Sequence, residues 1–350
     1  MNGLIGYYVH HQGEGHRQRA AAIAAAYRGP MTLIGTGLAG MPGNIPSLDL
    51  PDDRLPHGAF DGADGAMRPP SLHYAPLHHS GLRQRVAMIA DWIAASRPHF
   101  MIIDVSVEVA MLSRLASVPI IYVRLNGRRD DRPHRDAYAS AAALLAPFPE
   151  LFDDPSTPDW VKAKTCYAPG IVTAKASATV DPGRVLVVVG KGGAAADGDM
   201  WAAAAAAVPE RNWRVIGPAT QPTRTPDNLE ICGWVDNAEG EIASAGVVIG
   251  AAGDGLVSAV LANGRPFICR PEPRAFDEQV CKAERLAALD AAIVVSQWPQ
   301  PAHWRSLLEA AEPQAKRRLP ALHACDGAAQ AARWLERMVA WPQPVMEAGS

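Results

Sequence analysis

Short apolar runs alternate with alanine-rich helical patterns along the chain. Leu4–His10, Phe100–Ile103, Val185–Val189 and Val247–Ile249 have the length and β-branched content of buried strands. Several of them precede a helical pattern, and in 81–95 the apolar residues recur at helical spacing. Strands that alternate with helices are typical of parallel sheets with helices on both faces. The pattern therefore predicts an α/β fold.

The chain is long enough for two such units. Its 350 residues suffice for two domains of ordinary size. The stretch Phe148–Arg184 is rich in proline and separates two series of strands and helices. We expect the linker between the domains near Pro169–Val180.

Three glycine-rich turns each follow an apolar run and precede a helical pattern. Glycine lets the backbone approach a ligand closely, and a helix N-terminus favours negative charge. Each turn is therefore a candidate phosphate cradle, and Lys191 offers a counter-charge. The Gly-x-x-x-x-Gly-Lys-Ser/Thr pattern of P-loops is absent. The three turns are Gly13-x-Gly15-His16, Gly190-Lys191-Gly192-Gly193 and Gly253-Asp254-Gly255.

The richest group of motifs lies between Leu229 and Leu289. In chain order its parts are Gly233-Trp234-Val235-Asp236, Val247–Ile249, Ala252-Gly253-Asp254-Gly255, Gly264-Arg265-Pro266 and Gln279. This order resembles the donor-binding half of GT-B glycosyltransferases, in the family 28 branch that holds the peptidoglycan N-acetylglucosaminyltransferase and the galactolipid synthases. Two positions depart from that family, because Leu256 replaces a Thr and Ala259 replaces the Glu that usually holds the donor ribose.

The resemblance extends to the N-terminal half, where Gly13-x-Gly15-His16-x-x-Arg19 is similar to the family's first loop. It implies a GT-B fold, in which two Rossmann-like domains with parallel sheets face each other across a cleft. The expected parts are an acceptor-binding domain at 1–168, a donor-binding domain at 169–326 and a terminal helical segment at 327–350 that packs back on the first domain.

The implied activity is transfer of a sugar from a nucleoside diphosphate donor, most simply a UDP- or dTDP-sugar, to an acceptor hydroxyl. The resemblance implies inversion at the sugar and no metal at the leaving phosphate. We expect no cofactor besides the nucleotide sugar. The predicted donor contacts are Gly13, Gly15, Gly190, Lys191, Gly192, Gly193, Trp234, Val235, Gly253, Asp254, Gly255, Ser258 and Gln279.

Such a transfer needs a base for the acceptor proton, and His16 is the first choice because an imidazole exchanges protons near neutral pH. Glu14, Asp104 and Glu108 are the rivals. Asp104 follows a strand, and we expect it to cap the next helix rather than to act in catalysis. Asp254 is awkward beside a diphosphate. It could turn outward, bind a sugar hydroxyl or mark a site that has lost its donor.

The acceptor is expected on the variable loops of the first domain, about Gly35–Gly81 and Asn126–Arg135. It could be a small molecule, a lipid-linked compound or a glycan. The arginine-rich Asn126–Arg135 is interpreted as a solvated loop, with contact to an anionic acceptor or a membrane surface as the alternative. The spacing of His73, His78 and His79 matches no metal site, so no metal is predicted.

Composition adds limits on partners and location. The formal net charge of −3 gives no indication of nucleic-acid binding. The five cysteines form no Cys-x-x-Cys pair, which favours a reducing compartment. No signal-peptide layout and no apolar run of about 18 residues is present, so a cytoplasmic protein is expected. The oligomeric state is not predicted.

Two other functions remain open at this point. An epimerase on the same fold would convert a nucleotide sugar without an acceptor. A non-catalytic relative would bind a glycan or nucleotide only, as Leu256 and Ala259 suggest. Conversion of the donor alone would identify an epimerase, and a panel of nucleotides would test for the binding protein.

Overall fold

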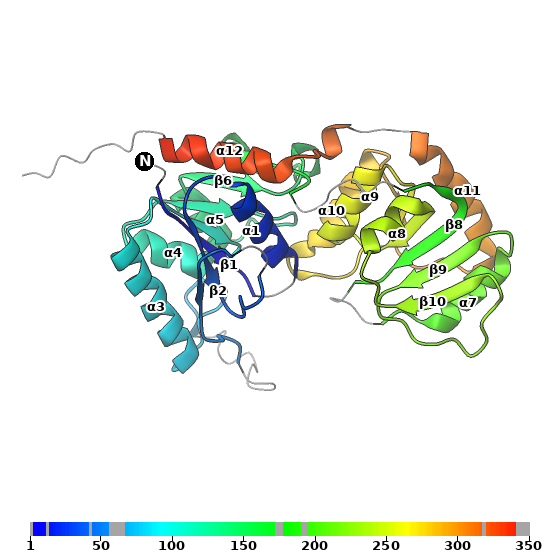
Figure 1. Ribbon diagram of the computed structural model, residues 1–350, viewed down its shortest axis with the longest axis horizontal. Coiled ribbons are helices and arrows are strands. Elements are labelled where there is room, and N and C mark those ends of the chain that lie inside the picture. The colour runs from blue at the N-terminus through cyan, green and yellow to red at the C-terminus, as the bar shows by residue number, and fades with distance from the viewer. Residues whose placement is uncertain are drawn as a thin grey trace, which may run out of the picture.

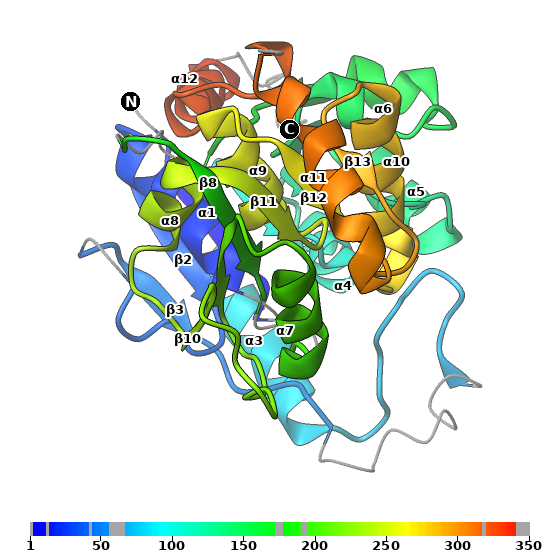
Figure 2. The ribbon, with the colours of Figure 1, turned by 90° about the vertical axis from the view of Figure 1, so that its right-hand side faces the viewer.

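The computed structural model consists of two α/β domains that lie side by side (Figure 1). It describes residues 3–11, 14–41, 44–55, 67–171, 178–190, 195–316 and 320–340. Each domain is built on one parallel sheet, so the predicted fold class is confirmed. Figure 2 looks along the line that joins the domains, with the second domain in front.

The first domain holds a seven-stranded sheet in the order β3-β2-β1-β4-β5-β6-β7. Its strands are β1 Ile5–Val9, β2 Met31–Gly35, β3 Ser47–Asp49, β4 Phe100–Asp104, β5 Ile120–Val123, β6 Ala143–Ala146 and β7 Thr165–Tyr167. Its helices are α1 Glu14–Ala26, α3 Ser80–Ser96, α4 Val107–Leu115, α5 Arg132–Ser140 and α6 Asp159–Ala163.

The second domain holds a six-stranded sheet in the order β10-β9-β8-β11-β12-β13. Its strands are β8 Asp181–Val188, β9 Asn212–Ile216, β10 Leu229–Gly233, β11 Ala245–Gly250, β12 Phe267–Cys269 and β13 Ile293–Val294. Its helices are α7 Gly198–Ala207, α8 Ala238–Ser244, α9 Asp254–Asn263, α10 Glu278–Ala288 and α11 Trp304–Ala311, and α12 Gly327–Ala340 follows them. Short 3₁₀ helices lie at Glu150–Phe152, Ala275–Asp277, Pro301–His303, Glu312–Lys316 and Pro320–Leu322.

Both sheets are buried on their two faces, which is why their strands are continuous apolar runs rather than alternating ones. In β1, Tyr7 packs in the core under α1 while Tyr8 packs in the core under α3 and α4. In β8, Leu186 faces the core under α8, α9 and α10, whereas Val185 and Val187 face the core under α7 and α11. Figure 1 shows these helices on opposite sides of the second sheet.

Helix α12 returns from the second domain to the first, where it lies along α1 (Figure 1). Ala331, Ala332 and Leu335 of α12 are buried in the same core as Ala20 and Ile23 of α1. The C-terminal helix thus closes the first domain by burying one apolar stripe.

Three strands have no counterpart in the sequence prediction. Strand β3 lies inside 35–81, β7 lies inside the proline-rich stretch, and β13 follows α10. Each has only two or three residues and adds to the edge of a sheet by backbone pairing, so its own side chains carry little signal. Among the described residues, no helix combines the length and apolarity needed to span a bilayer.

Candidate active site

A histidine, an aspartate and an arginine meet where β4 ends beside the first turn of α1. His16 Nδ1 lies 3.0 Å from Asp104 Oδ2. Arg19 Nη2 donates to both Asp104 oxygens at 3.1 Å and lies 2.9 Å from His16 Nδ1. The three side chains come from β4 and from positions three apart on α1, which share one helix face.

Asp104 is the fully buried anion of this group. Burial alone would raise its pKa, but the charges of Arg19 and His16 and their hydrogen bonds outweigh burial and lower the pKa to about 2. The carboxylate is therefore ionised at neutral pH. The expectation that Asp104 caps α4 is wrong, because Ser106 accepts from the Val109 backbone N–H and is the N-cap. The buried Asp104 carboxylate instead binds Arg19 and His16.

His16 lines a cavity of about 660 Å³. The cavity is walled mainly by the first domain, and 274–276 and Glu278 of the second domain also line it. The ring centre of neighbouring His10 lies 5.3 Å from that of His16, with the two rings tilted. Burial and then the nearby His16 and His11 lower the pKa of His10 to about 3, so His10 is neutral. This volume suits a small molecule rather than a macromolecular surface.

Across from α1, the N-terminus of α9 carries an ion pair that the sequence did not reveal. Lys282 Nζ of α10 donates to Asp254 Oδ1, and Lys282 is 1 % exposed. The Asp254 side chain is 44 % exposed, in a crevice whose walls desolvate it. Desolvation would raise its pKa, but Lys282, and then Arg19 and His16, lower it. The charges of Arg19 and His16 on α1 thus act on Asp254 at the N-terminus of α9.

The remaining predicted donor residues lie around the carboxyl edge of the second sheet. Trp234 follows β10 and is 59 % exposed, and Val235 is half-buried. Ser258 lines a small cavity together with Asp254 and Lys282. Gln279 Oε1 accepts from the backbone N–H groups of Ala252 at 3.1 Å and Glu272 at 2.9 Å. Gln279 thus ties the turn after β11 to the loop after β12.

The described glycines fall into two groups: those whose backbone conformation or close neighbours exclude a side chain, and those where a side chain would meet nothing. Most described glycines have a positive φ, or a Cβ there would meet a neighbouring atom. At Gly246, for example, a Cβ would lie 2.4 Å from the Pro182 carbonyl oxygen. Four described glycines have neither a positive φ nor any neighbour within 4 Å, and they are Gly15, Gly190, Gly253 and Gly255. All four belong to the three predicted cradles, where the open space can receive a ligand.

Some predicted residues cannot be placed. Gly13, Lys191, Gly192 and Gly193 lie outside the described residues, and so does the side chain of Glu14. Glu108 is described and is fully engaged. Its Oε1 accepts from the backbone N–H groups of His73 and Tyr74, and its Oε2 accepts from Ser106 Oγ at 3.0 Å. Glu108 therefore holds a loop in place and is poorly suited to act as a base.

The interpretation of Asn126–Arg135 as a solvated loop is wrong. Arg129 pairs with Glu278 of the second domain at 3.2 Å, and Arg128 pairs with Asp277 at 3.0 Å. The Arg128 backbone N–H also donates to the Phe276 carbonyl at 2.7 Å. From Arg132 onward the segment is helix α5. Half of the segment therefore joins the domains beside the cavity, and the other half is helical.

The sequence interpretation also missed Lys282 and the pair Asp131 and His134. Lys282 lies three residues after Gln279 on the buried face of α10, so helical spacing could have indicated it. Asp131 and His134 form the N-cap and first turn of α5. Their distance from His73 in the chain gave no local signal.

Comparison with known proteins agrees with this arrangement. Residues 217–317 match the glycosyltransferase family 28 C-terminal domain, which covers the turn after β10 and helices α8 to α11. No curated protein matches the chain at a significant level of sequence similarity.

Solved glycosyltransferases share the whole architecture. The kitacinnamycin glycosyltransferase aligns with a TM-score of 0.72 at 14% identity, over 97% of this chain and 100% of that one. The calicheamicin glycosyltransferase CalG4 aligns with a TM-score of 0.66 at 15% identity, over 97% and 98%. MurG of Acinetobacter baumannii aligns with a TM-score of 0.62 at 15% identity, over 95% and 99%. These likenesses establish the GT-B fold.

Proposed function

We propose that this GT-B glycosyltransferase moves a sugar from a nucleoside diphosphate donor to a hydroxyl of a small acceptor held in the cavity beside His16. The observation that carries the proposal is the set of four glycines, Gly15, Gly190, Gly253 and Gly255, whose lack of a side chain is explained by no contact among the described residues. They line the turns at the start of α1, after β8 and at the start of α9. These are the turns that a diphosphate would approach.

The donor lies mainly on the second domain in this proposal. Its diphosphate sits at the N-terminus of α9, where the backbone N–H groups of a ten-residue helix favour an anion. Gly190 borders the same region, and the exposed ring of Trp234 offers a face on which the nucleobase can stack. A relative of the same fold, the spinosyn rhamnosyltransferase SpnG, is described as a complex with thymidine diphosphate. A dTDP- or UDP-sugar is therefore the first choice.

His16 is the base in this mechanism. In this mechanism the two Nη2 protons of Arg19 are directed to the Asp104 oxygens, and the ionised Asp104 also accepts the Nδ1 proton of His16, which leaves the Nε2 lone pair for the acceptor. Nε2 takes the proton of the acceptor hydroxyl while its oxygen attacks the anomeric carbon from the face opposite the diphosphate. The bond from that carbon to the phosphate oxygen breaks, and the nucleoside diphosphate leaves with the electron pair. One displacement inverts the anomeric centre.

The leaving group is stabilised by fixed charges of the chain. Lys282 and the α9 N-terminus together present positive charge where the additional negative charge of the leaving diphosphate develops. We therefore expect transfer and nucleotide binding to persist in excess EDTA. Turnover that falls to background with EDTA and returns with Mg²⁺ or Mn²⁺ would show that the protein charges do not suffice.

An epimerase on the same fold is the alternative. It would need no acceptor, whereas the cavity beside His16 provides room for one. Product analysis with UDP- and dTDP-sugars alone separates the two. An altered sugar would support the epimerase, and unchanged or slowly hydrolysed donor would support the transferase.

Substitution of the open glycines tests the donor site. Gly253→Ala and Gly255→Ala should each weaken UDP or dTDP binding at least tenfold by calorimetry, because the methyl group takes ligand space. The fold should be unaffected or slightly stabilised, since the Cβ meets nothing and Ala favours helix at Gly255. Roughly 0.4–1 kcal/mol of added stability is the usual gain for such a change.

Gly246→Ala is the matched control in the same domain. Its Cβ would press on the Pro182 carbonyl, so the thermal midpoint should fall while the folded protein keeps its nucleotide affinity. Wild-type affinity in both Gly253→Ala and Gly255→Ala would remove the main support for the proposed donor site. Absence of nucleotide binding in the wild type would refute it directly.

A further inference from the structure

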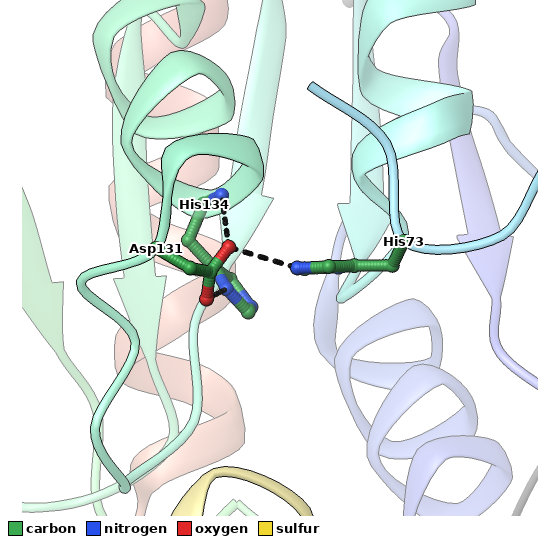
Figure 3. Close-up of side chains that lie close together, drawn as sticks. All are labelled: His73, Asp131 and His134. Carbon is green, nitrogen blue, oxygen red and sulfur yellow. Dashed lines mark hydrogen bonds and ion pairs between the residues drawn. The ribbon is translucent and has the colours of Figure 1, made fainter. Parts of the chain in front are cut away.

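In the wall of the same cavity, His73 forms a further histidine–aspartate pair, with Asp131 (Figure 3). His73 Nε2 is 2.8 Å from Asp131 Oδ1, and His134 Nδ1 is 2.6 Å from Asp131 Oδ2. Asp131 is the N-cap of α5, and His134 lies in its first turn. His73 comes from the segment before α3, so in Figure 3 it approaches Asp131 from the opposite side.

The partners of each group fix where its protons are. Hydrogen bonds and charge from His134 and His73 outweigh the effect of burial on Asp131 and lower its pKa to about 2, so Asp131 is ionised. Arg129 Nη1 lies 3.2 Å from His134 Nε2 and can only donate. Nε2 of His134 therefore accepts, and its Nδ1–H donates to Asp131. Burial and then Arg129 lower the pKa of His134 to about 4, which keeps this ring neutral.

One ring nitrogen of His73, Nδ1, can accept a hydrogen bond from a ligand. In the neutral form of His73, Nε2–H donates to Asp131, and Nδ1 then carries a lone pair. Among the described residues, no group bonds to this Nδ1, and the ring lines the cavity. The backbone around the ring is fixed, because the N–H groups of His73 and Tyr74 donate to Glu108 at 2.7 and 2.8 Å. Contacts within the protein thus hold the Nδ1 atom of His73 in position.

By spacing alone, these three side chains could hold a divalent cation. The hydrogen bonds argue against it. A metal on His134 Nδ1 would move the ring proton to Nε2, directly against the Arg129 guanidinium. It would also bring a cation next to a fixed positive charge. Both Asp131 oxygens already accept hydrogen bonds from N–H donors, so the cluster is complete without a metal.

Two imidazoles of the cavity, His16 and His73, lie 3.0 and 2.8 Å from an aspartate oxygen, and each keeps one nitrogen that bonds to no other described residue. His11 lies farther from Asp53, at 3.6 Å. His16 and His73 differ in what lies next to them. His16 is close enough to Asp254 and Glu278 to lower the pKa of the one and oppose the rise of the other, so it is the histidine on the donor side. His73 instead adjoins Phe276, at 5.3 Å between ring centres, and His134 at 4.6 Å. The two rings can therefore serve different groups of one acceptor.

We propose that His73 is an acceptor-positioning residue whose Nδ1 accepts a hydrogen bond from a second hydroxyl of the acceptor while His16 serves the reacting hydroxyl. This rests on the proposed function, and it narrows the acceptor to small molecules with at least two hydroxyl groups on an apolar body. Tyr8, Tyr74 and Phe276 line the cavity and give that body apolar surfaces. When a molecule with only one hydroxyl binds, His73 Nδ1 receives no hydrogen bond from it and is left either unpaired or bonded to water.

Binding of paired probes without donor tests this selectivity. The probes are the two naphthols and a set of isomeric dihydroxynaphthalenes, titrated against the full chain by calorimetry. The wild type should bind at least one dihydroxynaphthalene roughly 10–100-fold more tightly than either naphthol, as a site built for a second hydroxyl would. His73→Gln should remove this preference and leave naphthol binding within about twofold.

Two further variants exclude a merely structural role. His73→Asn places an amide oxygen near the Nδ1 position and should retain most of the preference, whereas His73→Gln reaches only towards Asp131. His79→Gln changes a histidine of the same segment that caps α3 outside the cavity, and should retain all of it. If the dihydroxynaphthalenes turn over, KM should rise in His73→Gln while kcat stays near the wild-type value.

Three results would overturn the proposal. One is equal affinity of the wild type for mono- and dihydroxy probes, or no binding of any probe. Another is an equal loss for both probe types in His73→Gln and His73→Asn. The third is stoichiometric Zn²⁺ binding that His73→Gln abolishes, which would make the cluster a metal site. Nucleotide binding is measured separately with UDP and dTDP. Failure there with intact diol selectivity would reject the donor assignment alone.

Discussion

The His16→Ala variant should turn over roughly 10²–10⁴-fold more slowly than the wild type at saturating donor and acceptor, the usual contribution of a positioned base. The reason is geometric. His16 faces the cavity with Nε2 while Asp104 holds Nδ1, and no other described side chain of the cavity has this arrangement beside α9. Nucleotide affinity should change little, because the proposed donor contacts lie on the second domain. Steady-state kcat and the nucleotide Kd are measured separately.

Asp104→Asn tests the positioning of that base. An amide in place of the carboxylate can donate to Nδ1, which would put the proton on Nε2 and block proton uptake. We expect kcat to fall by at least 10²-fold, with a shifted pH profile and little change in donor Kd. A structural defect would instead lower the thermal midpoint and donor affinity together.

His79→Ala is the control for a histidine outside the cavity. It should cost roughly 0.5–2 kcal/mol of stability through the lost α3 cap, without an effect on kcat. Wild-type turnover in His16→Ala and His16→Gln would contradict the assignment and move the base to Glu14 or Asp104.

The fold could be predicted because its information is local. Buried parallel strands such as Val185–Val189 are continuous apolar runs, and β4 and β11 each lead into a helix within a few residues. The GT-B arrangement was expected from the resemblance of the motifs in 229–289, and the family 28 match falls on that same region. The prediction missed β3, β7 and β13, since edge strands of two or three residues depend on the neighbouring strand for their pairing.

The site could be predicted only in part, for a related reason. Glycine turns and His16 are visible in the chain because each lies between a strand and a helix. Their partners are not. Asp104 was assigned to a helix cap because the residue type fits that role, and only the folded sheet brings Arg19 and His16 to it. His73 and Asp131 are 58 positions apart, and their pairing depends on how two loops meet over the sheet.

Removal of Asp254 should strengthen nucleoside diphosphate binding, which is the opposite of the usual result for a residue in a binding site. Its carboxylate stands at the first position of α9 and occupies Lys282, the counter-charge that a diphosphate would use. We expect Asp254→Asn to bind UDP and dTDP roughly 10–100-fold more tightly, because the anion no longer meets a carboxylate and Lys282 is free to donate. Without nucleotide the variant should melt at a lower temperature, since the buried ammonium has lost its anionic partner.

Lys282→Met is the opposing test and should lower nucleotide affinity by about 10²-fold, through the loss of a charge-assisted hydrogen bond. Met is similar in length and apolar, so it should fill the buried path of the Lys side chain. In the double variant Asp254→Asn with Lys282→Met, Asp254→Asn should recover only part of the lost affinity, because it has no Lys282 to free, and the cycle then gives the coupling between the pair. If Asp254→Asn instead weakens binding of UDP, whose diphosphate carries no donor sugar, Asp254 contacts the nucleotide itself. In that case the ion pair would be part of the donor site rather than a competitor for it.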